Sequence, residues 1–328
     1  MTDNIYDAVI LGAGVIGLAI SKKLSEEGKE VLIIEEQGQI GSVTSSRNSG
    51  VIHAGVYYDK ESLKAKFCPE GNRRIYEYCI SRSIPHLNTG KFIVATSNNE
   101  IEKLDNILNQ ANEAGVVDIE KVTGSYISDK EPLIKCVEGL YVSSSGIVDA
   151  SALMRSYLGD IEDKGGMISY NTCFKQADID NSLFKILVSQ NHEEIEINSH
   201  ILINATGIYA EISANNFLFL DKSNIPKTFY AKGNYFETGK KLGIKHLIYP
   251  VPNEASLGLH LGLDMGMTVR FGPDVEWVDE ISYEVNKNRE EIFYNDIIKY
   301  IPSFDRSMLK PGYSGIRPKL KGKGQGKS

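Results

Sequence analysis

The order of apolar and polar positions near the N-terminus predicts a strand, a turn and a helix. The run "YDAVILGAGVIGLAI" indicates a buried strand over 8–11, a glycine turn and a helix that continues to about Glu27. A second apolar run, "EVLIIEE", follows at the spacing of a β-α-β unit. The pattern therefore predicts an α/β, Rossmann-like domain at the start of the chain.

Helical and extended patterns alternate through the middle of the chain. Apolar residues at helical spacing predict helices over 61–83 and 98–115, and the run over 90–97 predicts a strand between them. A further helix is expected to begin at Asp149 or Ser151, either of which suits the N-cap position. These elements continue the mixed α/β pattern beyond the N-terminal unit.

Strands dominate the second half of the chain. Alternating apolar and polar residues predict a β-meander over 167–207, with turn residues between its strands. The segment 216–308 is rich in strand patterns and aromatic residues, which predicts a mostly antiparallel sheet. We therefore expect a Rossmann-like part and a second part built on a mostly antiparallel sheet.

Composition limits the classes of protein to consider. A chain of 328 residues can form two modules with substantial cores, and a net charge of −7 without a basic stripe argues against nucleic-acid binding. Cys68, Cys79, Cys136 and Cys173 show no C-x-x-C spacing, which argues against a metal site or a disulfide framework and fits a reducing cytoplasm. The longest apolar run, 8–20, is broken by glycines and is too short for a membrane span.

Three glycines in the predicted turn form the pattern G-x-G-x-x-G. Gly12 suits the tight turn, Gly14 lets a pyrophosphate approach the backbone, and Gly17 lets the helix pack against the strand. The helix N-terminus adds a partial positive charge for the anion. Glu35, near the end of the second strand, is placed to bind ribose hydroxyls. Together these residues predict a site for the adenosine half of FAD or NAD.

Further motifs carry a resemblance to a known family. The segments "NSGVIHAG" and "GYSGIRPK", with "SLKAKFCPEGNRRIYEYC", "GLYVSSSGIVDA" and "ILINATGIYA" in the same order, resemble the L-2-hydroxyglutarate dehydrogenase/oxidase family, which is FAD-dependent and of D-amino-acid oxidase type. The resemblance spans most of the chain and implies FAD as the cofactor. It also implies a discontinuous FAD-binding domain (1–85, 146–215 and 309–328) and a substrate domain (86–145 and 216–308).

The resemblance assigns several further residues to the cofactor. The stretch after the second strand would follow the pyrophosphate towards the flavin ring, the strand around 172–174 would lie near the adenine, and the turn after "ILIN" near the pyrophosphate. The cofactor-binding candidates besides the glycine turn and Glu35 are Ser45, Ser46, Asn48, Ser49, Gly50, Cys173, Ala205, Thr206 and Gly207. For 45–50, a capped loop that leads into a helix is the alternative interpretation.

His53 follows the stretch assigned to the flavin, and three roles are open for it. An imidazole titrates near neutral pH, so it could take a proton from a substrate hydroxyl. Some members of the resembled superfamily attach the flavin covalently through a histidine in a similar context, so His53 could be a tether. It could also be a hydrogen-bonded core residue.

Arg317, in "GIRP", is the expected carboxylate-binding residue. A guanidinium matches a carboxylate with two parallel hydrogen bonds and stays charged, and the resemblance implies this role for an arginine in this context. Tyr249 and His260 lie in predicted strands with apolar neighbours, where an inward polar group could line a pocket; a surface or merely hydrogen-bonded position is the alternative for each. We expect Arg317 and Tyr249 to bind substrate, and His53, His260 and Arg317 to be catalytic.

The resemblance implies an enzyme that oxidises an L-2-hydroxy dicarboxylic acid, with L-2-hydroxyglutarate as the leading candidate and 2-oxoglutarate as its product. His53 or His260 would accept the hydroxyl proton while hydride passes to flavin N5. A quinone, another carrier or oxygen would accept the electrons, and a peripheral contact with the inner membrane face would suit a quinone. The alternatives are an amine or amino-acid oxidase of the same superfamily and a non-catalytic flavin-binding fragment.

The C-terminal end differs from the resembled family. Chains of that family continue after "GYSGIRPK" with a further strand and a helix whose N-terminus would stabilise the charge of reduced flavin. This sequence ends at "KGKGQGKS". We therefore expect the FAD-binding domain to be truncated at this end.

Overall fold

The N-terminal strand, turn and helix form as the sequence pattern predicts. The computed structural model, which describes residues 5–252 and 258–325, contains β1 (Ile5–Leu11), α1 (Val15–Glu26) and β2 (Val31–Ile34). β1 and β2 pair in parallel, as a β-α-β unit requires. The predicted Rossmann-like unit is confirmed.

Within the described residues, six strands form the first sheet, in the order β10-β11-β12-β1-β2-β9. The strands from the predicted meander are β9 (Met167–Ser169), β10 (Thr172–Asp180), β11 (Leu183–Gln190) and β12 (Glu193–Asn204). β10 to β12 pair antiparallel, whereas β12 pairs in parallel with β1 and β2 in parallel with β9. The meander therefore extends the Rossmann-like sheet.

Successive residues of β1 face two different cores. Ala8 and Ile10 pack with Met154 of α5 (Ala150–Glu162), whereas Val9 and Leu11 pack on the opposite face with residues of β10 and β11. Burial on both faces explains why β1 reads as an unbroken apolar run.

Within the same described residues, nine strands form the second sheet. Its path is β17-β13-β16-β15-β14-β5-β7-β6, with β18 paired to β13. The bounds are β5 (Lys91–Ala95), β6 (Ile119–Thr123), β7 (Glu138–Val142), β13 (Phe229–Glu237), β14 (Leu247–Pro250), β15 (Leu261–Leu263), β16 (Val269–Phe271), β17 (Glu276–Val278) and β18 (Lys310–Lys319). Only β14 and β5 pair in parallel, so the mostly antiparallel character is confirmed. A small third sheet joins β3 (Val51–Ile52), β8 (Gly146–Val148) and β4 (His86–Leu87).

The predicted helices form, and the described residues contain three further α-helices. α2 (Leu63–Ser81) and α3 (Ile101–Glu113) occupy 61–83 and 98–115, and α5 has Asp149 as its N-cap, because the Asp149 carboxylate accepts a hydrogen bond from Ala152 N at 2.9 Å. The description of 216–308 as sheet was wrong for α7 (Glu290–Tyr300), whose Phe293 packs against Phe236 of β13. Two short helices complete this set, α4 (Gly124–Lys130) and α6 (Ala210–Asn215).

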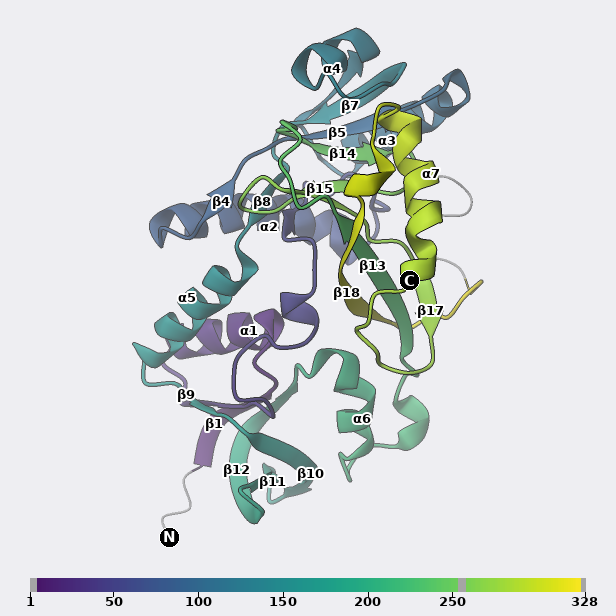
Figure 1. Ribbon diagram of the computed structural model, residues 1–328. Coiled ribbons are helices and arrows are strands. Elements are labelled where there is room, and N and C mark those ends of the chain that lie inside the picture. Colours follow the sequence, from purple (N-terminus) through teal and green to yellow (C-terminus); the bar gives the residue numbers. More distant parts are fainter. Residues whose placement is uncertain (1–4, 253–257, 326–328) are drawn as a thin grey trace.

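The two sheets lie at different levels of the molecule. Figure 1 shows the first sheet at the bottom of the view and the second in the upper half and on the right, with α1 and α5 above the first sheet. β18 belongs by hydrogen bonding to the second sheet, although the predicted division put 309–328 in the FAD-binding domain. Residues 253–257, inside the predicted substrate domain, lie outside the described residues. The domain boundaries therefore stay a prediction.

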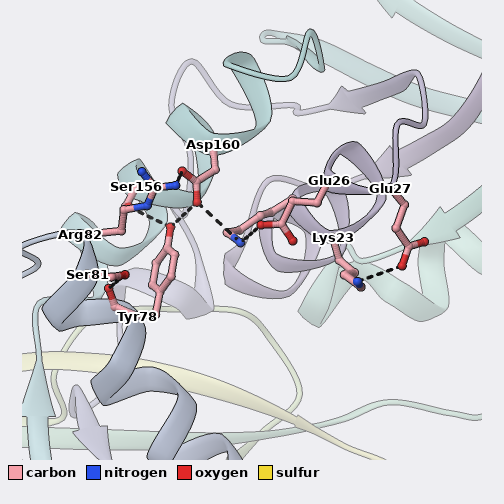
Figure 2. A network of polar contacts seen from close by, with 9 residues as sticks. Lys23, Glu26, Glu27, Tyr78, Ser81, Arg82, Ser156 and Asp160 are labelled. Atoms are coloured by element: carbon pink, nitrogen blue, oxygen red, sulfur yellow. Dashed lines mark hydrogen bonds and ion pairs between the residues drawn. The ribbon is translucent and has the colours of Figure 1, made fainter.

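One polar network links α1, α2 and α5. Asp160 of α5, 8% exposed, accepts a hydrogen bond from the Tyr78 hydroxyl of α2 at 2.8 Å and forms an ion pair with Arg82 at 2.5 Å. Figure 2 shows Tyr78 and Arg82 converging on this carboxylate, and the Tyr78 hydroxyl also lies 2.9 Å from Ser156 Oγ. Lys22 of α1 lies 3.6 Å from the same carboxylate.

Among the described residues, no helix is long and apolar enough to cross a membrane.

We expect Asp160→Ala to lower the free energy of unfolding by about 1–3 kcal/mol, because it leaves the Tyr78 hydroxyl and two cations without their shared acceptor. Glu162→Ala, at an exposed position of the same helix, is the matched control and should change stability by less than about 0.5 kcal/mol. Denaturant unfolding of both variants measures the difference. Equal losses would show that the network contributes nothing specific.

Candidate active site

The glycine turn brings α1 very close to β1. Gly12 has a φ of +98°, which suits glycine, and its N–H donates to Ile34 O at 2.8 Å. A Cβ added to Gly17 would lie 2.0 Å from Gly12 O, so any side chain there would push the helix away from the turn. The predicted roles of Gly12 and Gly17 in shaping the turn therefore have a direct steric basis.

The carboxylate of Glu35 points back at this turn. Its Oε2 accepts a hydrogen bond from Ala13 N at 2.7 Å, and its Oε1 accepts one from Gln37 N at 2.8 Å. The backbone of Glu35 also accepts from Thr172 N at 3.0 Å, which sets the start of β10, and with it Cys173, beside the end of β2. The structure thus brings Glu35, Cys173 and the glycine turn to one end of the first sheet.

The turn after β12 packs directly on the glycine turn. Ala205 N donates to Leu11 O at 2.9 Å, and a Cβ on Gly12 would lie 2.8 Å from Ala205 O. Thr206 follows, and Gly207 has a φ of +62° with no atom within 4 Å of an added Cβ. Two turns that are far apart in the sequence therefore line one place in the fold.

The stretch 45–50 begins at the N-terminus of α1. Ser45 Oγ accepts a hydrogen bond from Val15 N at 2.9 Å, and the Asn48 side chain bridges Ser45 O (2.7 Å) and Gly50 N (2.8 Å). A cavity of about 380 Å³ adjoins the stretch. Its lining residues include Ser46, Asn48, Ser49, Gly50, Asp264 and Arg270. Four of the five predicted cofactor-binding residues of this stretch, all but Ser45, thus line this cavity.

His53 lies just beyond that stretch, near the other predicted catalytic residues. Its side chain keeps solvent-accessible surface although protein atoms surround it closely. Burial lowers the pKa of His53 to about 3, and the charges of Lys91, His260 and Arg317 act in the same direction. His53 is therefore neutral at physiological pH.

The backbone at His53 is held by a buried amide. Asn72 of α2 donates from Nδ2 to His53 O at 3.1 Å and to Ser144 O at 3.0 Å. Gly55, with a φ of +94°, then turns the chain towards α2. These contacts fix the direction in which the His53 side chain leaves the backbone.

Tyr249 and His260 face each other across β14 and the segment before β15. Their rings stack with centroids 3.6 Å apart and planes 6° from parallel. Tyr249 is 3% exposed, and burial raises the pKa of its hydroxyl, so this group stays protonated. The two residues form one aromatic wall near His53, whereas a surface position was the alternative for each.

Arg317 is in β18, where it pairs with Ala231 of β13. Its side chain is exposed, and its charge adds to the lowering of the pKa of His53 that burial causes. Burial raises the pKa of Tyr58, and the Arg317 charge partly opposes this rise. The same strand contacts the stretch 45–50, because the Tyr313 hydroxyl donates to Asn48 O at 2.7 Å. The structure thus brings Arg317, like His260, close enough to His53 for its charge to act on that imidazole.

Sequence reasoning missed Lys91 and the tyrosines around it. Lys91 is 1% exposed at the start of β5, and its Nζ lies 5.0 Å from the centroid of the Tyr249 ring and 5.5 Å from that of Tyr57. A lysine that begins the apolar run "KFIVA" is the signal that could have identified it, because a buried strand seldom holds a cation.

The fold and the glycine turn define a dinucleotide-binding α/β protein, and the comparisons identify its family. The family model described as "FAD dependent oxidoreductase" matches residues 7–326. The chain belongs to this family of D-amino-acid oxidase type and is an FAD-dependent oxidoreductase.

Curated relatives agree with the resemblance drawn from the motifs. The chain is 36% identical to the mitochondrial L-2-hydroxyglutarate dehydrogenase of Arabidopsis thaliana, over 96% of this chain and 74% of that protein. It is 32% identical to L-2-hydroxyglutarate dehydrogenase of Escherichia coli (strain K12), over 94% of this chain and 76% of that protein. The chain is thus a homologue of 2-hydroxy acid dehydrogenases.

Solved structures show the same fold. The L-alpha-glycerophosphate oxidase from Mycoplasma pneumoniae with FAD bound has a TM-score of 0.85 at 20% identity, covering 96% of this chain and 83% of that one. Glycine oxidase from Geobacillus kaustophilus has a TM-score of 0.80 at 17% identity, covering 95% and 82%. At these identities the likeness supports the fold and does not distinguish substrates.

The glycine turn suggests a direct test of cofactor binding. A Cβ on Gly14 would meet only Ser45 Oγ, at 3.1 Å, so Gly14→Val should fold but fill the space where a pyrophosphate would approach the backbone. We expect the purified variant to lose FAD, measured as the ratio of flavin to protein absorbance after gel filtration. Gly159→Ala, where an added Cβ meets nothing within 4 Å, is the control. Full flavin content in Gly14→Val, with unchanged circular dichroism, would place the cofactor elsewhere.

Proposed function

We propose that this protein oxidises L-2-hydroxyglutarate to 2-oxoglutarate. The observation that carries the proposal is the group formed by neutral His53, the stacked pair of Tyr249 and His260, and the Arg317 cation, in which His260 and Arg317 both act on the pKa of His53. The names and identities of the two dehydrogenase relatives support the choice of substrate.

The residues at the glycine turn fit FAD. Gly14 carries no Cβ where the first turn of α1 offers backbone N–H groups, and Glu35 lies against the same turn. In our proposal Gly12, Gly14 and Gly17 hold the pyrophosphate side, and Glu35 holds the ribose. The residues expected to line the rest of the cofactor are Ser45, Ser46, Asn48, Ser49, Gly50, Cys173, Ala205, Thr206 and Gly207. FAD, when bound, supplies the acceptor for the hydride of the substrate carbon.

The protein's own side chains would orient the substrate and take its proton. Arg317 is a permanent cation on an exposed strand position, and we assign it to the α-carboxylate. His53 has a free imidazole base at neutral pH, because its pKa is lowered, and we assign it to the substrate hydroxyl. His260, stacked on Tyr249, is the second candidate for the proton. A reoxidising electron acceptor is also required, as in any dehydrogenase.

Anaerobic reduction of the flavin tests the substrate. We expect L-2-hydroxyglutarate to bleach the flavin absorbance of the FAD-loaded protein, because hydride transfer from this substrate reduces the flavin. Glycine and sarcosine should leave the absorbance unchanged. Bleaching by the amino acids alone would instead make the protein an amino-acid or amine oxidase, and retention of FAD without bleaching by any of them would support a non-catalytic flavoprotein.

Removing the His53 imidazole tests its role. We expect His53→Ala to lower kcat by about 10²–10⁴ with FAD still bound, because the hydroxyl would lose its base. In the wild type, the lowered pKa keeps the base form down to acidic pH, so kcat/KM should show no acid limb with a midpoint near 6.5. Steady-state kinetics between pH 5 and 8 measure both.

The matched variant His260→Ala decides between the two histidines. If His260→Ala loses the greater part of kcat and His53→Ala does not, the base is His260. Acid precipitation addresses the tether: flavin that precipitates with the wild type but not with His53→Ala would show a covalent link. Unchanged kcat together with extractable flavin would remove both roles from His53.

A further inference from the structure

Lys91 is a buried cation that nothing in the described chain neutralises at close range. It is 1% exposed, and no carboxylate oxygen of the described residues lies within 4 Å of its Nζ. Burial lowers the pKa of this ammonium to about 8, while the more distant Cys68 and Asp118 partly oppose the shift. Burying a charge without a partner is costly, and a bound anion from outside the chain would offset this cost for the Lys91 ammonium.

The surroundings of Lys91 also suit an anion. The centroids of the Tyr57 and Tyr249 rings lie 5.5 Å and 5.0 Å from its Nζ, so the ammonium makes cation–π contacts with both. The Tyr57 hydroxyl is buried and has no hydrogen-bond partner among the described residues. A protonated phenol beside an ammonium is a ready donor for a carboxylate. The Lys91 ammonium and the Tyr57 hydroxyl are therefore both donors that one carboxylate would satisfy.

Lys91 and Arg317 reach the site from different strands. Lys91 begins β5, which pairs with β14, the strand that carries Tyr249. Arg317 belongs to β18, which pairs with β13. Both charges act on His53. A substrate beside His53 thus has two cations available from two different strands, which matches a molecule with a carboxylate at each end.

We propose that Lys91, with the Tyr57 hydroxyl, binds the distal carboxylate of a dicarboxylic substrate, while Arg317 binds the α-carboxylate. This assignment rests on the proposed function for its substrate but concerns a different property, the selection of dicarboxylates over monocarboxylates. Lys91 is then the residue that determines specificity.

The test uses binding of inert acids, so it does not require turnover. Glutarate and butyrate, which differ in the distal carboxylate, are titrated into the FAD-loaded protein and followed by calorimetry. We expect Lys91→Met to weaken glutarate binding at least about 30-fold and to change butyrate binding less than about threefold. Arg317→Lys is the comparison variant and should weaken both acids, because both carry the carboxylate that it binds.

Thermal unfolding separates binding from support of the fold. Because Met removes a buried charge at similar volume, Lys91→Met should unfold at the same or a higher temperature in the absence of acid, with FAD content unchanged. Tyr57→Phe, which removes only the hydroxyl, should also weaken glutarate more than butyrate. Equal weakening of both acids by Lys91→Met, unchanged glutarate binding, or a lowered unfolding temperature would overturn the proposal. Absence of turnover with L-2-hydroxyglutarate, with the glutarate preference intact, would overturn only the proposed function.

Discussion

The close approach of α1 to β1 at the glycine turn is the constraint on which the site depends. With 2.0 Å between an added Gly17 Cβ and Gly12 O, only glycine lets the helix start directly above the strand end. Three distant segments then meet at that start: Ser45 at the helix N-terminus, the Glu35 carboxylate at Ala13, and the Ala205 turn. Because these contacts fix the beginning of the stretch 45–50, they also help to fix the position of His53, which follows this stretch.

The surroundings of His53 are dominated by positive charge. Lys91 and Arg317 both act on His53, and the hydroxyls of Tyr57 and Tyr249 stay protonated because burial raises their pKa values. A site with two cations, protonated phenols and a neutral imidazole attracts an anion and still offers one base. Burial is the main reason that His53 stays deprotonated, and the two cations that would assist carboxylate binding act on its pKa in the same direction.

The sequence predicted the local elements better than the long-range site. The glycine turn, α2, α3 and the Asp149 cap follow from spacing and capping within one segment, so one segment suffices to predict them. α7 was missed because its buried positions lie among aromatic residues that also favour strands. Lys91 was missed because its importance comes from Tyr57 and Tyr249, which approach it only through the pairing of β5 with β14 and the turn after β3.

The two motifs that were most specific in the sequence turn out to touch each other. A Cβ on Gly315, in "GYSGIRPK", would lie 2.1 Å from Arg47 O, directly before "NSGVIHAG". Thr44 Oγ1 donates to Ile316 O at 3.3 Å, and the Tyr313 hydroxyl donates to Asn48 O. The strand that carries Arg317 is thus fastened to the stretch that leads to His53. Since the proposed carboxylate anchor and the proposed proton acceptor are set by one contact surface, a shift of β18 would move both together, and glycine at position 315 allows the close contact.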